Sequence, residues 1–398
     1  MRVCHNISTV FDDPNLISHG GLPAMMELAD HAGLNGLVDE HVRLPGTAGA
    51  NAAVKVSAVV AGMLTGADSI SDLDVLRHGG MGRIFDGLRA ATTLGTHLRG
   101  YTFGHIRQLD AVASRFLTRL ASCSPILSGA DQIAFVDVDD TIRETHGYQK
   151  QGAAYGYSKV KGLNAQLAVI STPLAAPMIG GARLRKGNSA SAHGAGTLIT
   201  ETLNTLGRAA AGQGLVIVRA DSAYFNRDTI HAIIRGGARF CVTAKMNPAI
   251  TRAIAAIKDD AWQAIKYPNA IFDEDQQRWI SDAEVAEIEF TAFQSPKADR
   301  VTARLIVRRV KRLNPRHQDE LLPGWRHHAV FTDNPMPLLQ AEACHRDHAL
   351  VEQVIADLKD GALAHAPSGK FLGRLARDGN DGVQPQPGRR VVGFRGFG

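Results

Sequence analysis

Carboxylates interrupt three segments that would otherwise be apolar. Asp137, Asp139 and Asp140 lie in one strand-like run, Asp221 ends a second, and Glu352 stands among apolar residues of a helix-like segment. Because side chains alternate along a strand, Asp137 and Asp139 share one face and Asp140 points to the other. Like charges this close are costly to bury, so the pattern indicates a site that takes a cation.

Carboxylate oxygens are the ligands that Mg²⁺ prefers, and Mn²⁺ accepts the same set. We therefore expect a divalent-metal site built from the first strand, Asp221 and Glu352. Two such ions can activate water or a 3′-hydroxyl and stabilise the leaving oxygen of a phosphodiester. The competing interpretation is that each strand-end aspartate is an ordinary cap or turn residue. The acids are far apart in the chain, so only tertiary folding can bring them together.

The surrounding pattern predicts a helical first third, with apolar residues at helical spacing over 51–64 and 103–120. A mixed α/β region begins near residue 131, and a final helix over 341–358 carries Glu352. The predicted strands are 133–144, 163–172, 214–225, 240–246, 286–294, 301–312 and 327–334, with a helix over 196–211 between the second and the third.

Composition excludes several classes of protein. The 398 residues carry 44 Lys and Arg against 39 Asp and Glu, with 44% hydrophobic residues, which is the balance of a globular protein. No apolar run is long enough to cross a membrane, and no secretory leader is evident. The four cysteines form no CxxC pair, so no disulfide framework is indicated and a reducing cytoplasm is expected.

Three blocks of sequence carry a resemblance to a known family. They are VDVDDTIRETHGYQKQGAAYGYSKVKGLNAQL, VIVRADSAYF and HRDHALVEQVIADLKDG. Together they resemble the catalytic blocks of DDE transposases from bacterial insertion sequences, most closely insertion-sequence family 1380. The resemblance implies an RNase H-like catalytic domain, a mixed α/β sheet with flanking helices and a β-rich insertion before the last acid, preceded by a helical domain.

The same resemblance assigns roles to individual residues. Asp139, Asp221 and Glu352 match the three catalytic metal ligands, while Asp137 either assists them as a ligand or is structural. Related transposases carry Tyr, Arg, Glu and Lys on the last helix, and the corresponding positions here are His345, His348, Glu352 and Lys359. Lys359 and, more weakly, His348 are therefore expected to contact DNA phosphate.

Other basic residues are candidates for DNA contact because Lys and Arg neutralise phosphate. Those near the acids are Lys150, Lys159, Lys161 and Arg185. Those spaced along one face of the helix over 103–120 are Arg107, Arg115 and Arg119. The alternative for each of them is an ordinary solvated surface charge.

These observations predict five regions. They are a helical DNA-binding domain (1–130), the first part of the catalytic domain (131–239), a β-rich insertion (240–335), the last catalytic helix (336–370) and a flexible basic tail rich in Gly, Arg and Pro (371–398).

The expected function is transposition in a bacterial cytoplasm, in association with the nucleoid. The expected partners are the inverted repeats at the element's ends, target DNA and a second copy of the chain in the synaptic complex, without a membrane. The sequence after residue 370, rich in Gly, Arg and Pro, departs from the pattern of the family that the chain resembles. This departure keeps open a second interpretation, an inactive copy that only binds DNA. A simple RNase H-like nuclease is a third.

Overall fold

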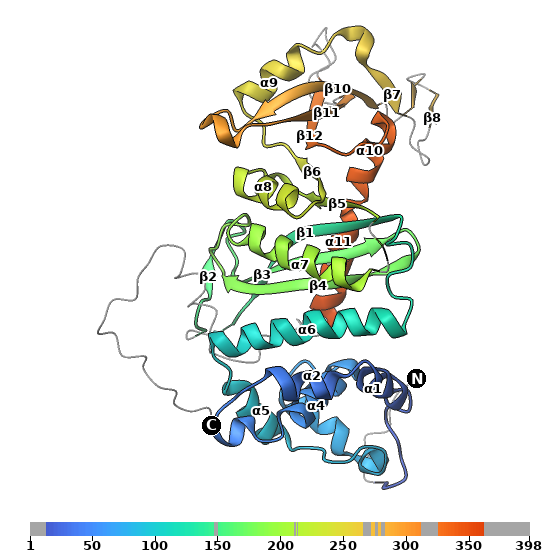
Figure 1. The fold of residues 1–398 in the computed structure, drawn as a ribbon, viewed down its shortest axis with the longest axis vertical. Helices are drawn as coiled ribbons and strands as arrows, with labels where there is room; N and C mark the ends of the chain where they lie inside the picture. Colours follow the sequence, from blue (N-terminus) through green and yellow to red (C-terminus); the bar gives the residue numbers. More distant parts are fainter. Residues whose placement is uncertain are drawn as a thin grey trace, which may run out of the picture.

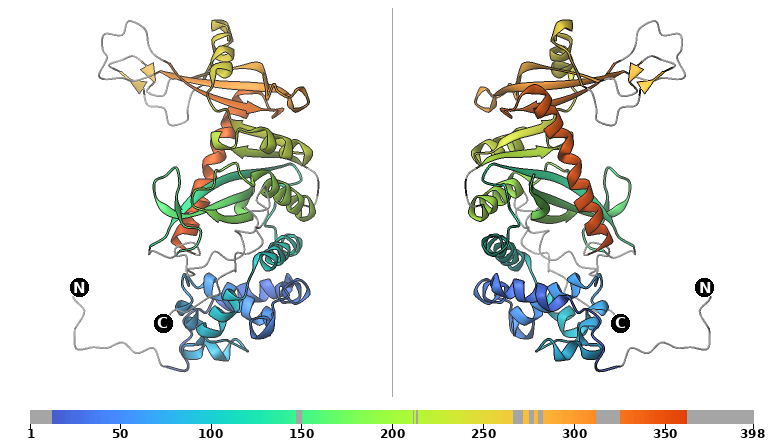
Figure 2. Two further views of the ribbon diagram at one scale, coloured as in Figure 1. Left: turned by 90° about the vertical axis from the view of Figure 1, so that its left-hand side faces the viewer. Right: turned by 90° about the vertical axis from the view of Figure 1, so that its right-hand side faces the viewer.

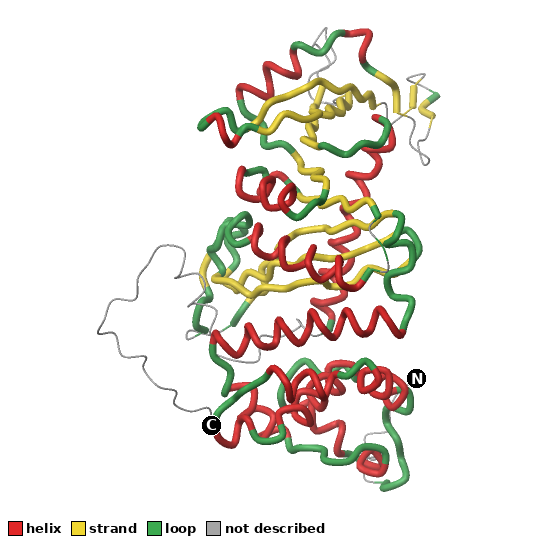
Figure 3. Tube along the Cα trace, in the orientation of Figure 1, coloured by secondary structure: helices red, strands yellow, loops and turns green. Residues whose placement is uncertain are grey.

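The computed structural model describes residues 13–146, 150–210, 212, 214–265, 272–274, 278–279, 283–311 and 325–361. Figure 1 shows three tiers along the longest axis: helices of the N-terminal region, a central sheet with its helices, and the strands β10–β12 at the other end. Figure 3 separates the same tiers by secondary structure. The predicted tail over 371–398 lies outside the described residues.

The N-terminal tier is helical, as its spacing predicted. Its helices are α1 (Leu22–His31), α2 (Leu34–His41), α3 (Gly46–Gly49), α4 (Ala52–Leu64), α5 (Ala91–Arg99) and α6 (Phe103–Cys123), with 3-10 turns at Ser71–Arg77 and Gly79–Arg83. Leu37 and Val38 of α2 are fully buried in the core of this tier, against apolar residues of α4 and α6. Thr102 begins α6 with a capping box that includes His105.

The central sheet combines antiparallel and parallel strands. Its strands are β1 (Ile133–Glu144), β2 (Ala154–Tyr155), β3 (Lys161–Thr172), β4 (Ala175–Lys186), β5 (Leu215–Ala220) and β6 (Arg239–Thr243). β1 pairs antiparallel with β3 and parallel with β5, β3 also pairs with β4, and β5 pairs parallel with β6. This is the strand order of the RNase H-like fold, so the predicted fold class is confirmed.

Helices cover both faces of this sheet (Figure 2). On one face, α7 (Ala195–Ala209) buries Leu198 and Ile199 against Val136 and Val138 of β1, and α8 (Arg227–Arg235) joins the same core. On the other face, α11 (Leu350–Asp360) packs against β3. The helix α10 (Leu338–Arg346) and a short 3-10 turn lead into α11.

The β-rich insertion continues the central sheet. The remaining elements are α9 (Pro248–Ala255), β7 (Gln263–Ile265), β8 (Phe272–Asp273), β9 (Arg278–Trp279), β10 (Ala283–Ala292), β11 (Val301–Lys311) and β12 (Trp325–Thr332), with 3-10 turns at Ser222–Tyr224, Asp259–Ala261, Lys297–Asp299 and Asp347–Ala349. β12 pairs with β6, so the sheet runs from β2 to β7 without a break. Among the strands that the structure describes, β8 and β9 pair only with each other. The sequence predicted neither this continuity nor α9.

The strands β2, β4 and β7 of the sheet were missed from sequence, and β4 is the longest of them. β4 follows β3 after a two-residue turn and pairs with it along most of its length, with irregularities near Val169 and Thr172. The pair Gly180 and Gly181 lies in the middle of β4, where glycine argues against a strand. Glycine suits both positions, because a Cβ on either would lie under 3 Å from side-chain atoms, with Thr202 of α7 among the neighbours of each, and these side chains would have to shift.

Among the described residues, no helix is both long enough and apolar enough to cross a membrane.

Candidate active site

Asp139 and Asp221 lie side by side where the ladder between β1 and β5 ends. The parallel ladder between β1 and β5 ends at the pair Val138 and Ala220. Asp139 follows Val138 in the sequence, and Asp221 follows Ala220. Asp221 then caps a short 3-10 turn, its Oδ1 accepting a hydrogen bond from the amide of Ala223 at 2.9 Å. The Oδ1 of Asp139 accepts from the amide of Asp140 at 2.7 Å. The register of the sheet therefore brings these two predicted acids together.

The surroundings of the two carboxyls disfavour their ionised forms. Burial, reinforced by the charge of Asp221, raises the pKa of Asp139 to about 6. Burial also raises the pKa of Asp221, and the charge of Asp140 adds to the effect. Within the described residues, each of the two carboxyls keeps one oxygen without a hydrogen bond.

Glu352 lies on α11, which covers the same face of the sheet. Leu167 is the cross-strand partner of Asp139, and side chains directly opposite one another project from the same face. Leu167 packs in one cluster with Val354 and Ile355 of α11. Glu352 is exposed on the flank of that helix. The helix thus brings the third predicted acid to the face of Asp139.

The three acids do not form a closed cluster. Among the described residues, no group of three or more acidic, histidine or cysteine side chains stands close enough together to hold a metal ion. The charge of Asp221 raises the pKa of Asp139, and the charge of His348, which lies four residues before Glu352, lowers the pKa of both aspartates. The arrangement is an adjacent pair of acids with the third on a facing helix.

Asp137 requires a correction. It is fully buried, and its two carboxylate oxygens accept hydrogen bonds from Nε and Nη2 of Arg219, each at 2.7 Å. Nδ1 of His348 lies 2.8 Å from Oδ1 of the same carboxylate. Because both oxygens are already taken by protein groups, Asp137 has a structural role and is not the assisting metal ligand that its position on the strand suggested.

The buried ion pair of Arg219 and Asp137 connects the sheet with the segment that leads into the last helix. Arg219 is 2% exposed in its side chain, lies over the ring of Phe135 at 4.3 Å and donates through Nη1 to the carbonyl of Cys344 at 2.7 Å. Cys344 belongs to α10, and His348 leads into α11. Arg219 and Asp137 therefore connect β1, β5 and the segment that begins the Glu352 helix. His348 faces Asp137 with one ring nitrogen, which leaves its predicted phosphate contact without support from this geometry.

Asp140 points to the opposite face, as strand alternation predicted. Its Oδ2 accepts from Nη2 of Arg185 at 2.6 Å and from Asn164 at 2.7 Å, and its Oδ1 contacts the hydroxyl of Ser191 at 3.1 Å. Arg185 is buried and also donates to backbone carbonyls in the loop that precedes α7. Arg185 is therefore an internal ion-pair partner, which corrects the expectation that it contacts DNA.

The arginines of α6 divide into two kinds. Arg107 donates to Asp110 at 3.2 Å and to Glu201 of α7 at 2.7 Å, and Arg183 of β4 pairs with the same glutamate. Arg107 thus joins two helices, which supports the alternative of an internal ion pair, and its DNA contact stays a prediction. Arg115 and Arg119 are exposed and stay candidates.

The remaining basic candidates lie around the hairpin formed by β2 and β3. Lys159 is exposed, whereas Lys150 and Lys161 are half-buried and make contacts of their own. Lys359 lies on α11 seven residues after Glu352, a spacing that places both on the same side of the helix. Lys159 and Lys359 accordingly stay as predicted DNA contacts.

Sequence reasoning missed two basic residues of this region, Arg219 and Arg143. Arg219 carried a readable signal, since it is a lone arginine in the apolar run VIVRAD, and a buried arginine needs an acid. Its partner could not be named, because the match of Arg219 with Asp137 comes from the register of the parallel ladder. Arg143 gave no signal beyond its place in β1.

The strand order and the acids at the junction of β1 and β5 define an RNase H-like protein of the DDE class. The chain belongs to the family described as transposase DDE domain group 1, whose model matches residues 3–359. No curated protein matches the sequence. Membership of this family implies an enzyme that acts on DNA with the help of divalent metal ions.

Two of the three predicted acids lie where they fit such an ion. Asp139 and Asp221 offer carboxylate oxygens that make no hydrogen bond within the described residues. Burial, with a smaller contribution from neighbouring acids, raises the pKa of both groups, and a bound cation would favour their ionised forms. Oxygen ligands of this kind suit Mg²⁺ or Mn²⁺, both of which keep water in their coordination shell. Glu352 on the facing helix would complete the set.

Proposed function

We propose that this protein is the transposase of a bacterial insertion sequence, of the family 1380 type, and that it cleaves DNA at the element's ends and joins the free 3′-hydroxyl to target DNA. The observation that carries the proposal is the adjacency of Asp139 and Asp221 at the end of the β1–β5 ladder, on the face that α11 covers. An ordinary pair of strand-end caps would not need to share one face with a third acid.

In this proposal the chain's own residues hold and orient the reacting groups. Asp139, Asp221 and Glu352 hold the metal, and the chemistry supplied by bound Mg²⁺ is activation of water or a 3′-hydroxyl and stabilisation of the leaving oxygen. Lys359, on the same side of α11 as Glu352, contacts a phosphate beside the scissile bond. The buried pair of Arg219 and Asp137 keeps α11 in place over the sheet.

The N-terminal helices bind the element's ends, and two copies of the chain pair those ends in the synaptic complex. Exposed Arg115 and Arg119 of α6 are the contacts proposed for this tier. The place of action is the nucleoid in the bacterial cytoplasm.

The test is a cleavage and strand-transfer assay on DNA that carries the sequences flanking the coding region. Parent protein is compared with Asp221→Ala and with a matched control, Asp228→Ala, which removes a highly exposed acid of α8. We expect Mg²⁺-dependent nicking and joining by the parent and the control, and a loss of at least about a thousandfold in Asp221→Ala because a metal ligand is gone.

The outcomes separate the alternatives. End-specific binding without cleavage by any of the three proteins would identify a copy that only binds DNA, the second interpretation of the altered C-terminal sequence. Cleavage without joining would identify a simple nuclease. Cleavage that persists in Asp221→Ala would show that Asp221 is not a catalytic metal ligand and would contradict the predicted site.

A further inference from the structure

The first strand of the sheet continues well beyond the acids. The ladder between β1 and β5 ends at Val138, whereas β1 runs on to Glu144, a further length of about 20 Å. β3 pairs with this extension, and β4 and the short strand β2 pair in turn with β3. We call this projection the arm and define it as residues 140–144, 150–166 and 183–187.

The arm carries two cations on the face of the acids. Side chains alternate along β1, so Arg143 projects from the same face as Asp139. Leu163 of β3 is the cross-strand partner of both Arg143 and Lys186, so those three residues form one row on that face. Arg143 lies about 14 Å from Asp139 along the strand, or about four nucleotides of a DNA strand.

Arg143 is half-buried and has no acidic partner among the described residues. Its Nε is buried and has no hydrogen-bond partner, and within the described part of the chain no carboxylate pairs with its guanidinium. The other arginines of this part of the sheet, Arg183 and Arg185, both have acids. A partly desolvated guanidinium is stabilised by a bidentate anion, and phosphate has the matching geometry.

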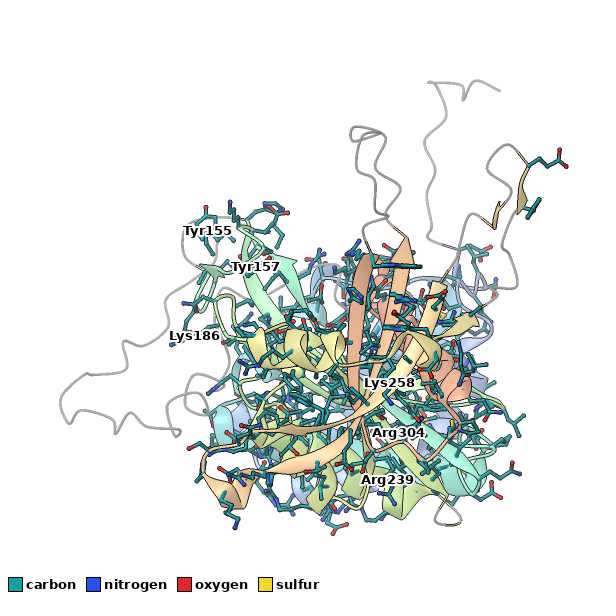
Figure 4. The ribbon with its side chains drawn as sticks, turned by 90° about the horizontal axis from the view of Figure 1, so that it is seen from above. Tyr155, Tyr157, Lys186, Arg239, Lys258 and Arg304 are labelled. Atoms are coloured by element: carbon teal, nitrogen blue, oxygen red, sulfur yellow. The ribbon has the colours of Figure 1, made fainter. Side chains whose placement is uncertain are left out.

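The tip of the arm presents two aromatic rings to solvent. Tyr155 is 69% exposed and Tyr157 is 105% exposed, and Figure 4 shows both at the same corner of the molecule as Lys186. Tyrosine ordinarily buries much of its ring, and two exposed rings among lysines resemble a surface on which nucleic-acid bases stack.

The backbone under these tyrosines is closely packed. A Cβ added to Gly156 would lie 2.4 Å from the carbonyl oxygen of Gly187, and one added to Gly187 would lie 2.0 Å from that of Gly162. The amide of Gly187 also donates to the carbonyl of Gly152 at 3.0 Å. Glycine at these two positions therefore allows the backbone segments under the tyrosines to approach this closely.

We propose that the arm is a binding site for substrate DNA next to the scissile bond. Arg143 and Lys186 contact the phosphates of the strand that lies on the acids, and Tyr155 and Tyr157 stack on unpaired bases further along it. The inference rests on the proposed function and adds to it both the element that holds the DNA flank and the preference for unpaired bases there.

The phosphate contact is tested by DNA binding at several salt concentrations. The probes are fluorescein-labelled 40-bp duplexes, blunt or with a 10-nucleotide single-stranded extension. We expect Arg143→Gln to weaken binding about tenfold and to reduce the slope of log K against log salt by about 1. Arg143→Lys should keep the parental slope. The matched control is Arg235→Gln, an exposed arginine of α8 on the opposite side of the sheet.

The stacking contact is tested with the same probes. The double variant Tyr155→Ser/Tyr157→Ser should lose a preference of about tenfold for the extended duplex over the blunt one, and Tyr155→Phe/Tyr157→Phe should keep it. Thermal melting confirms that each variant is folded. Parental binding and slope in Arg143→Gln, together with an unchanged preference in the serine variant, would overturn the proposal.

The two levels of inference fail in different ways. If the parent protein cleaves element ends and the arm variants bind DNA as the parent does, the proposed function is supported and the role of the arm is refuted. A parent protein that binds neither probe and cleaves nothing removes the proposed function and the arm with it.

Discussion

The carboxyls of Asp139 and Asp221 are held together at a cost in folding free energy. Burial and mutual repulsion raise the pKa of Asp139 to about 6, above its value of 3.8 in an unfolded chain. Between these values the folded state binds more protons than the unfolded state. Stability therefore falls as the pH rises through this window, and without metal it is lowest once the carboxyl is ionised.

Asp139→Asn should consequently stabilise the metal-free protein at pH 7. The expected gain in free energy of unfolding is about 1–3 kcal/mol, because the amide removes the buried charge. At pH 4 the gain should disappear, since Asp139 is then protonated in the folded state. Urea denaturation at both pH values measures the difference.

A matched control for this prediction is Asp228→Asn, which changes an exposed acid of α8. Mg²⁺ should raise the melting temperature of the parent and of Asp228→Asn while leaving Asp139→Asn nearly unchanged, because only a bound ion stabilises the folded state. A gain in Asp228→Asn equal to that in Asp139→Asn would contradict the assignment of the excess charge to the predicted site.

At the scale of elements, the pair of Arg219 and Asp137 joins two parallel strands to the helix that carries Glu352. Removing one partner leaves the other charged and buried, so Arg219→Met should lower the free energy of unfolding by about 3–5 kcal/mol. The double variant Asp137→Leu/Arg219→Met should recover most of this loss, because no unpaired charge is left. Urea denaturation of the two variants measures both values.

Activity separates this positioning role from stability. In the double variant, the carbonyl of Cys344 and the ring of His348 lose their partners, so α11 is less firmly held. We expect strand cleavage to slow by about tenfold with little change in DNA affinity, since Arg219 and Asp137 are buried away from any ligand. An equal loss of affinity and rate would indicate general disruption.

Elements with a local sequence pattern could be predicted, whereas features set by long-range contacts could not. β1 and β5 are apolar runs that end in acids, and their alternation correctly separated Asp140 from Asp139. β4 was missed because Gly180 and Gly181, which fit closely against side chains of the core, weaken a strand pattern. The joining of β12 to β6 is a long-range pairing, which no local periodicity specifies.

The same limit applied to the site. Its acids were readable because carboxylates within apolar runs are chemically anomalous, and the register of β1 and β5 places two of them side by side. Which charges are neutralised inside the protein was not readable. Asp137, Arg185 and Arg107 each looked available, and each finds its partner across a sheet or between helices.

At the scale of the whole molecule, α6 connects the N-terminal helices to the sheet. It packs on α2 on one side and on α7 and β4 on the other. Arg107 of α6 and Arg183 of β4 share the carboxylate of Glu201 on α7. Burial alone would raise the pKa of Glu201, but the two arginines lower it, so this contribution to stability is present at neutral pH and is lost in acid.

Arg107→Ala should therefore weaken the connection between the tiers without altering DNA recognition. The expected loss is about 1–2 kcal/mol in the free energy of unfolding at pH 7, because a partly exposed network is screened by solvent. The slope of DNA affinity against salt should stay parental, since this guanidinium is engaged by Glu201 and Asp110. Arg115→Ala, on the exposed side of the same helix, should show the reverse: unchanged stability and a smaller slope. Both measurements on both variants are needed, because a smaller slope in Arg107→Ala would return this arginine to the DNA-binding surface.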